Sequence, residues 1–98
     1  MSTYAQLLQE DRLLTILVLL ADSADYRANQ FLIQSALDGF GHAVSLDRLR
    51  ADLSWLAEQG LTEISNAGDV QVAKLTARGL DVAQGRVPCP GVKRPRPG

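Results

Sequence analysis

The residue types that carry catalysis and metal binding are scarce in this chain. His42 is the only histidine, and it lies in a glycine-containing segment where we expect an ordinary turn residue rather than a general base. Cys89, the only cysteine, stands between two prolines, with no predictable partner that would activate its thiol. No glycine loop of the phosphate-binding kind follows a strand, and no set of His, Cys or carboxylate residues has the spacing of metal ligands. The sequence therefore predicts a binding protein rather than an enzyme, with no cofactor and no metal.

Length and composition predict one small globular domain with a distinct end. The chain has 98 residues, of which 46% are hydrophobic, enough for one modest core. All 11 acidic residues and six of the ten basic ones lie in residues 1–85, which leaves this body acidic. Residues 86–98 carry the other four basic residues and all four prolines, a composition that should neither continue a helix nor fill a core. We expect a flexible basic tail there, either a solubilising end or a source of non-specific attraction to phosphate.

Three features of the sequence bear on where the protein works. A single cysteine excludes an intrachain disulfide, so a reducing cytoplasm is the simplest setting. The longest apolar run, residues 13–21, is interrupted by Thr15 and is far shorter than the roughly 20 residues that span a bilayer. Glu10 and Asp11 precede this run, where a secretory signal would carry basic residues. We therefore expect a soluble cytoplasmic protein that has no membrane partner.

The first helix should begin after Thr3, because Thr3 and Gln6 have the spacing of a capping box. This helix is apolar nearly all round, so it must be covered on more than one side. A domain of this size has few elements for that purpose, and we expect a homodimer interface that contains Leu13, Leu17 and Leu20. The alternative is that other helices and the sheet of the same chain cover the first helix completely.

A turn separates the second and third helices. Asn29, after a possible short strand, is a good N-cap for a helix over residues 30–38, and the glycines of residues 39–41 end that helix. Ser45 then caps a third helix, which runs to Gly60. Two helices joined closely by a glycine-containing turn are the signature of a helix-turn-helix.

A β-hairpin and a last helix complete the body. Residues 61–65 alternate as a strand should, residues 66–69 provide the turn, and residues 70–75 return. Thr76 caps the fourth helix. Gly79 weakens this helix, and we explain it by close packing on a neighbouring element.

The third helix has one apolar face and one mixed face. Leucines at helical spacing point inward: Leu46, Leu49, Leu53 and Leu56, with Ala57. The outward face consists of Asp47, Arg48, Ala51, Ser54, Trp55 and Glu58, with Arg50 and Asp52 on its two flanks.

Two segments resemble those of winged-helix regulators of the MarR and ArsR type. Residues 53–61, LSWLAEQGL, are similar to the end of the recognition helix in that family, and residues 75–80, LTARGL, resemble its strand-to-helix exit. The chain also resembles small winged-helix proteins of Mu-like bacteriophages and their prophages. The expected fold class is mainly α with a small β-hairpin, a winged helix-turn-helix over residues 1–85.

The resemblance implies that duplex DNA is the partner and that the first half of the third helix enters the major groove. Ser45, Arg48 and Arg50 would then be in place to contact phosphates or base edges. Lys74, on the wing, would add a further contact. The alternative for the arginines is that they are solvated and pair with neighbouring aspartates. The function implied is that of a transcriptional regulator of bacterial or phage origin.

The charges do not agree fully with DNA binding. The outward and flanking positions of the third helix carry one more acidic than basic residue, and the wing tip holds Asp69 where a basic residue is expected. Trp55 lies on the outward side, where a tryptophan is a typical anchor at protein interfaces, unless it packs against the wing or the first helix. The alternative function is therefore a winged helix that binds another protein, or serves as an assembly factor, without binding DNA.

Overall fold

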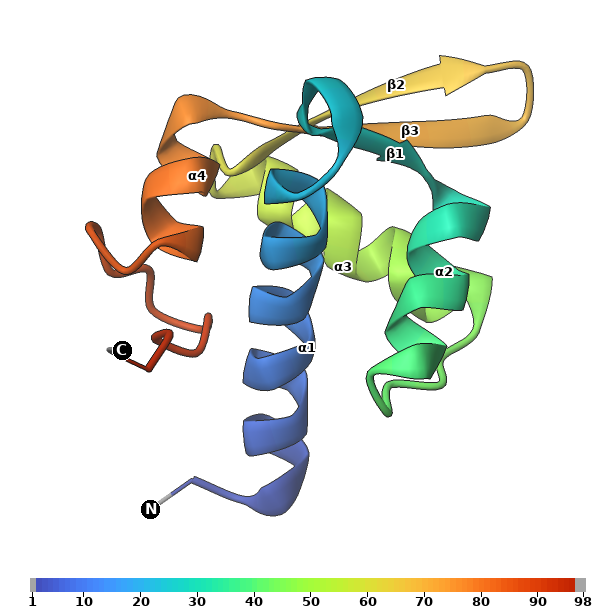
Figure 1. Ribbon diagram of the computed structural model, residues 1–98. Helices are drawn as coiled ribbons and strands as arrows, with labels where there is room; N and C mark the ends of the chain where they lie inside the picture. The colour runs from blue at the N-terminus through green and yellow to red at the C-terminus, as the bar shows by residue number, and fades with distance from the viewer. Residues whose placement is uncertain (1, 97–98) are drawn as a thin grey trace.

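The computed structural model describes residues 2–96 and has the expected order of elements. In Figure 1 a small sheet lies across one end of the helices, and the first helix extends beyond the others towards the N-terminus. The elements are α1 (Tyr4–Ala21), the 3₁₀ turn η1 (Ala24–Tyr26), β1 (Arg27–Asn29), α2 (Gln30–Gly39), α3 (Leu46–Glu58), β2 (Thr62–Ala67), β3 (Val70–Leu75) and α4 (Ala77–Ala83). Four helices with a three-stranded sheet confirm the predicted winged helix-turn-helix.

The helices begin at the residues that the sequence predicts. Thr3 and Gln6 form both bonds of a capping box, in which Thr3 Oγ1 accepts from the Gln6 amide and Gln6 Oε1 accepts from the Thr3 amide. Asn29, Ser45 and Thr76 each accept a hydrogen bond from the amide three residues further on. Each helix therefore has a side chain that satisfies one of the free amides of its first turn.

The sheet is antiparallel with the order β1-β3-β2, so β3 is its central strand. The hairpin of β2 and β3 is the wing, and pairing continues up to Ala67 and Val70. The predicted four-residue turn is therefore only two residues long. Gly68 has a φ of 63°, a left-handed conformation that glycine adopts without a steric penalty.

The core is built by one face of α1, and this corrects the predicted dimer interface. Leu13, Leu17 and Leu20 are all buried within the single chain, together with leucines of α3 and residues of the sheet. These side chains are not free to meet a second copy. For this face of α1 the alternative interpretation is confirmed: other helices and the sheet of the same chain bury it.

Gly79 lies where α4 touches the strand leaving α3, as its close-packing explanation requires. A Cβ at this position would lie 2.1 Å from the Leu61 carbonyl oxygen and 2.6 Å from Leu75 Cδ1. The contact includes backbone, which cannot turn away as a side chain can. Only glycine therefore allows α4 to approach the start of the wing this closely.

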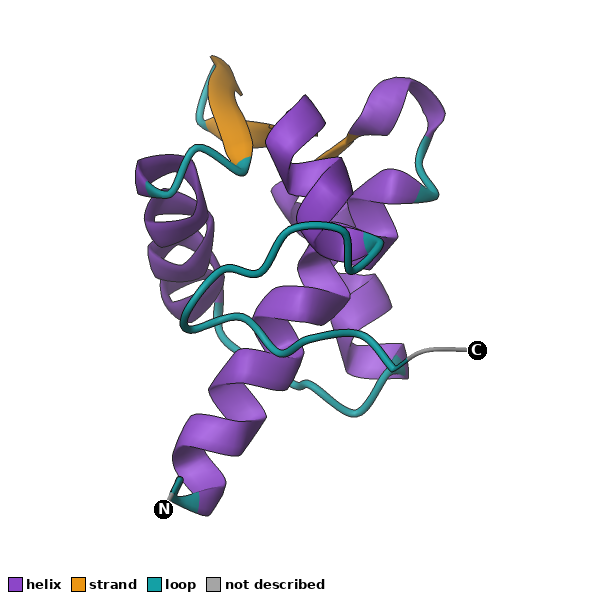
Figure 2. Ribbon diagram, turned by 90° about the vertical axis from the view of Figure 1, so that its left-hand side faces the viewer, coloured by secondary structure: helices purple, strands orange, loops and turns teal. Residues whose placement is uncertain are grey.

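The segment after α4 packs on the domain, which corrects the expectation that its composition cannot fill a core. Figure 2 shows this chain crossing α1 as an irregular loop. Cys89 and Val92 belong to the buried core cluster, and the Lys93 amide donates to the Glu10 carbonyl at 3.1 Å. Apolar side chains spaced along an extended segment suffice for this cover without a helix. Residues 97–98 of the predicted tail lie outside the described residues.

Gly79→Ala should lower the free energy of unfolding by about 1–3 kcal/mol, the usual cost of overpacking, although alanine favours helix by about 1 kcal/mol. Gly39→Ala is the matched control, because an added Cβ there meets nothing within 4 Å. Urea unfolding followed by circular dichroism measures both. A Gly79→Ala midpoint equal to or above that of the unchanged chain would contradict the close contact.

Deleting residues 87–98 should shift the fluorescence of Trp55 to longer wavelength, because a Cβ at Gly91 would lie 2.9 Å from Trp55 Cη2 and the segment therefore covers the indole. The chain has one tryptophan, so the emission reports this site alone. We also expect a loss of about 2 kcal/mol or more from exposing apolar side chains. An unchanged emission maximum would show that the segment does not cover Trp55.

Candidate nucleic-acid interface

The first half of α3 presents the outward face that the sequence predicts. Leu49 and Leu53 are fully buried, while Asp47 and Ala51 are exposed on the opposite side. Ser45 remains exposed at the N-terminus, and the Arg48 side chain is 52% exposed. Arg48 is thus the cation of α3 with the freest access to a ligand.

Asp52 does not belong to this outward face, because it is buried in an ion pair with α1. Arg12 Nε donates to Asp52 Oδ2 at 2.6 Å, and Arg12 Nη2 donates to Asp52 Oδ1 at 3.2 Å. Arg48 Nη1 lies 4.0 Å from the same carboxylate. Because Arg12 neutralises Asp52, the exposed charges of α3 balance and do not sum to a negative value. No local pattern predicts this pairing, since 40 residues separate the partners.

Arg50 connects α3 to the wing. Its Nη2 donates to the Asp69 carbonyl at 2.9 Å, and its Nε donates to Gln30 Oε1 at 3.1 Å. Gln30 is itself buried, and the same oxygen accepts from the Gln71 amide at 3.1 Å. Arg50 therefore uses two donors inside the chain and is not a free phosphate ligand. Gln30 was not predicted as part of this site, because a glutamine at the start of a helix is an ordinary surface residue.

The wing brings few positive charges to the interface. Its tip, residues 66–69, is exposed and contains no basic residue. Lys74 is exposed on β3 and lies in register with Arg27 of β1 and Glu63 of β2. Four residues of strand separate Lys74 from the start of β3, roughly 13 Å. Lys74 thus lies between basic Arg27, which the sequence did not indicate, and acidic Glu63 at the base of the wing.

His42 is an anchor between elements rather than an ordinary turn residue. Its side chain is buried, and its Nε2 lies 2.7 Å from Asp11 Oδ2 on α1. Lys93 Nζ donates to the other oxygen of Asp11 at 3.2 Å. The hydrogen bond from His42, and secondarily the charge and hydrogen bond of Lys93, hold the pKa of Asp11 below its usual 3.8, against the opposing effect of burial. This cluster joins α1, the α2–α3 turn and the C-terminal segment.

Trp55 is half-buried and does not stand free on the surface. Gly91 of the C-terminal segment lies against its ring. The predicted role as an interface anchor therefore requires that this segment move away. The expected alternative named the wing or the first helix as cover, and the segment that lies on the ring comes instead from beyond α4.

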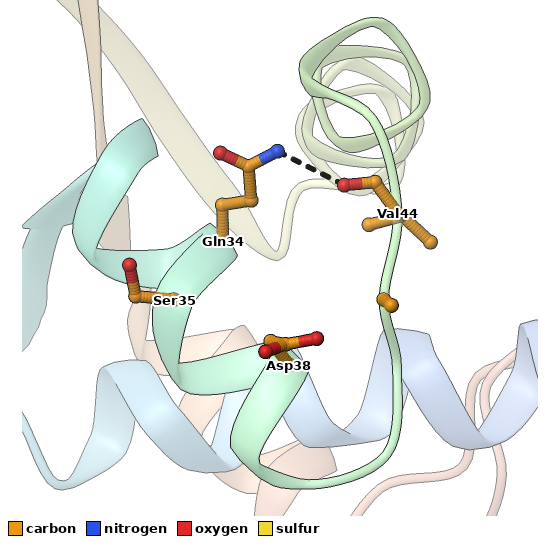
Figure 3. A pocket seen from close by; sticks show the side chains of 5 residues that line it. Gln34, Ser35, Asp38 and Val44 are labelled. Atoms are coloured by element: carbon orange, nitrogen blue, oxygen red, sulfur yellow. Dashed lines mark hydrogen bonds between the residues drawn. The ribbon is translucent and has the colours of Figure 1, made fainter.

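An open pocket lies between α2 and the segment before α3, and Figure 3 shows its lining. The lining residues are Gln34, Ser35, Asp38, Ala43 and Val44. Gln34 Nε2 donates to the Val44 carbonyl at 2.9 Å, so its amide is already used in the chain. Across residues 2–96, no group of three or more His, Cys, Asp or Glu side chains is placed to hold a metal ion.

No helix in the described part of the chain is both long and apolar enough to cross a membrane. The helix α1 has 18 residues, but it carries the charged residues Glu10, Asp11 and Arg12 near its middle.

Solved structures similar to this one show the fold. Two solved complex structures, of hsRosR-S1 and hsRosR-S4, superpose with a TM-score of 0.62 at 24% sequence identity. The similarity covers 85% of this chain and about two thirds of each hsRosR chain, 67% and 65%. At this identity the likeness concerns the arrangement of helices and strands alone.

Relatives at the level of sequence come from a phage and a bacterium, while no protein-family model matches. An uncharacterised protein of Haemophilus influenzae is 40% identical over 79 residues, which cover 80% of this chain and 76% of the relative. The uncharacterised protein gp26 of Escherichia phage Mu is 48% identical over 91 residues, covering 93% of this chain and 94% of gp26. The resemblance to proteins of Mu-like phages is thereby confirmed. With this identity over nearly the full length of both chains, the protein belongs to the family of phage Mu gp26.

Proposed function

We propose that the protein binds duplex DNA as a transcriptional regulator, with the first half of α3 in the major groove. The observation that carries this proposal is the bond of Arg50 to the wing tip beside the exposed half of α3. Helix and wing are thereby held as one surface, and a rigid surface keeps contact residues in place without an ordering cost. The winged-helix fold and the phage relative support a regulatory role in the cytoplasm of a bacterial host.

The charges of the interface support modest, salt-sensitive affinity. Arg48 and Ser45 are exposed at the start of α3 and are assigned to contact DNA directly. Arg50 positions the wing, and Lys74 with Arg27 supplies a second contact at its base. With so few cations facing the duplex, few counterions are released on binding, so affinity should depend on salt less steeply than in strongly basic DNA-binding proteins.

Arg48→Ala should weaken the retardation of duplex DNA. The expected loss is about 1–3 kcal/mol if Arg48 contacts a base edge, and the salt slope should fall by about 1 if it contacts a phosphate. A gel-mobility assay with a pool of phage and host genomic fragments at two salt concentrations measures both quantities. The proposal is rejected if the unchanged chain fails to retard any fragment at low salt.

Arg86→Ala is the matched control for that assay. Arg86 is an exposed arginine whose Nη1 lies 3.4 Å from Asp81, a surface pair of little energetic weight. It lies shortly after α4, and Figure 1 shows α4 on the side of the molecule away from the turn between β2 and β3. Its removal should leave DNA retardation unchanged, and an effect equal to that of Arg48→Ala would point to non-specific attraction by any cation.

A second function, contact with another protein, has support from an apolar surface on α2. Phe31 and Leu32 are 48% and 59% exposed side by side at the start of that helix. Large apolar groups left adjacent in water are typical of interaction surfaces. This surface replaces Trp55 as the candidate anchor, because Gly91 covers the indole.

Replacing Phe31 and Leu32 together by serine should abolish recovery of a partner protein by the tagged chain, while DNA retardation persists. The reason is that both side chains would lose the apolar area that a partner buries. Pull-down from host lysate, quantified by mass spectrometry against the unchanged chain, measures the loss. Equal recovery of every protein by both chains would remove α2 from the interaction.

A further inference from the structure

Gln30 is a buried polar residue at the first position of α2, where an apolar side chain of similar length would also fill the space. Gln30 is 2% exposed, and its Oε1 accepts from both Arg50 Nε and the Gln71 amide, each at 3.1 Å. Its Nε2 makes no hydrogen bond to any group of residues 2–96. Because a buried amide is costly unless it is hydrogen-bonded, the two bonds to the oxygen are the reason for a polar residue here.

These bonds continue the sheet from the point where β1 ends. Asn29 is the last residue of β1 and lies opposite Val72 of β3. Gln30 follows Asn29, and its side-chain oxygen accepts from Gln71, the next amide along β3 towards the wing turn. Beyond Val72 the wing has only the two strands of its hairpin, which alone is marginally stable in water. Gln30 therefore takes the place of a third strand.

Arg50 extends the same connection to the turn of the wing. Its Nη2 donates to the carbonyl of Asp69, which lies in the turn between β2 and β3. Figure 1 shows this turn on the side of the molecule where α2 lies. We call the bonds among Gln30, Arg50, Asp69 and Gln71 the Gln30 clamp. The clamp joins the far end of the wing to α2 and α3 together.

The clamp also determines how the charge of Arg50 is used. Arg50 lies on the flank of the face that carries exposed Arg48, and its bond to Asp69 is at the surface. Without the oxygen of Gln30, only that exposed bond would hold the guanidinium beside the wing. A released guanidinium at this place would reach the phosphates of a duplex bound on α3.

We propose that Gln30 is a positioning residue that gives the interface its sequence selectivity. It fixes the wing relative to α3, and it withholds from DNA a cation that would bind the backbone of any sequence. Contacts to phosphate carry no sequence information, so an interface with fewer of them depends more on base edges and on its own geometry. This inference rests on the proposed function and states how the same interface selects its DNA.

Gln30→Met removes the oxygen and keeps an apolar stem of similar length. Retardation of the mixed fragment pool should become stronger, and the salt slope should steepen by about 1, because the released Arg50 gains a phosphate. The preference for the best-retained fragment over the pool should fall by about tenfold, similar to the loss of discrimination at one base pair. In Gln30→Met/Arg50→Met the salt slope should return to that of the unchanged chain. Gel-mobility titrations at four salt concentrations measure slope and preference.

Gln30→Glu is the matched control, because it keeps the accepting oxygen and loses only the unused Nε2. Its salt slope and preference should equal those of the unchanged chain. This variant also decides the proposal if Gln30→Met fails to fold. If Arg50 left the clamp to contact phosphate in the native complex, the carboxylate would hold it back and the slope would become shallower. A shallower slope for Gln30→Glu therefore overturns the proposal.

Hydrogen exchange without DNA tests the clamp itself. The Gln71 amide should exchange about tenfold faster in Gln30→Met than in the unchanged chain, and at an equal rate in Gln30→Glu. Two-dimensional NMR measures the rates, and an equal rate in Gln30→Met overturns the clamp. If the unchanged chain retards no DNA, the proposed function fails and the role of Gln30 with it. If Arg48→Ala weakens retardation but Gln30→Met leaves slope and preference unchanged, the role of Gln30 fails alone.

Discussion

The buried ion pair of Arg12 and Asp52 is the contact on which the arrangement of α1 and α3 depends. Both partners lie among apolar side chains, where an unpaired charge costs about 3–5 kcal/mol. The pair fixes one rotation of α3 about its axis, with its leucines against α1 and Arg48 outward. It also withdraws an acidic residue from the exposed face. One interaction thus sets both the packing of α3 and the charge that it presents.

Polar side chains at the edges of the core hold the other elements in register with this pair. Gln30 joins the start of α2 to Arg50 and to β3, so the wing cannot move independently of α3. Asp11 joins α1 to His42 and Lys93. These hydrogen bonds use buried or half-buried groups and require a particular geometry. They therefore fix the relative orientation of the elements, which apolar packing alone specifies less strictly.

Local sequence signals predicted most of the fold. Thr3, Asn29, Ser45 and Thr76 act as caps because the bond that each makes lies within one helical turn. The close packing at Gly79 was predicted correctly, because glycine destabilises a helix interior and its presence there indicates that a side chain would not fit. In the candidate site, Arg48 is exposed as expected, whereas Arg50 donates to Gln30 and to the wing, 20 and 19 residues away in the sequence, which no local signal predicts. Contact of these arginines with DNA stays a prediction.

The sequence by itself determined the succession of helices and strands, because capping, helical spacing and turn residues act over a few positions. Only the tertiary structure decided which apolar face of α1 is covered, that Asp52 is neutralised, and that the C-terminal segment packs over Trp55. The ion pair joins residues 40 positions apart, Arg12 and Asp52, and Gly91 lies 36 positions beyond the Trp55 that it covers. The type of a residue shows that a buried charge needs a counter-charge or that an apolar face needs cover. Only the folded chain shows which distant residue supplies it.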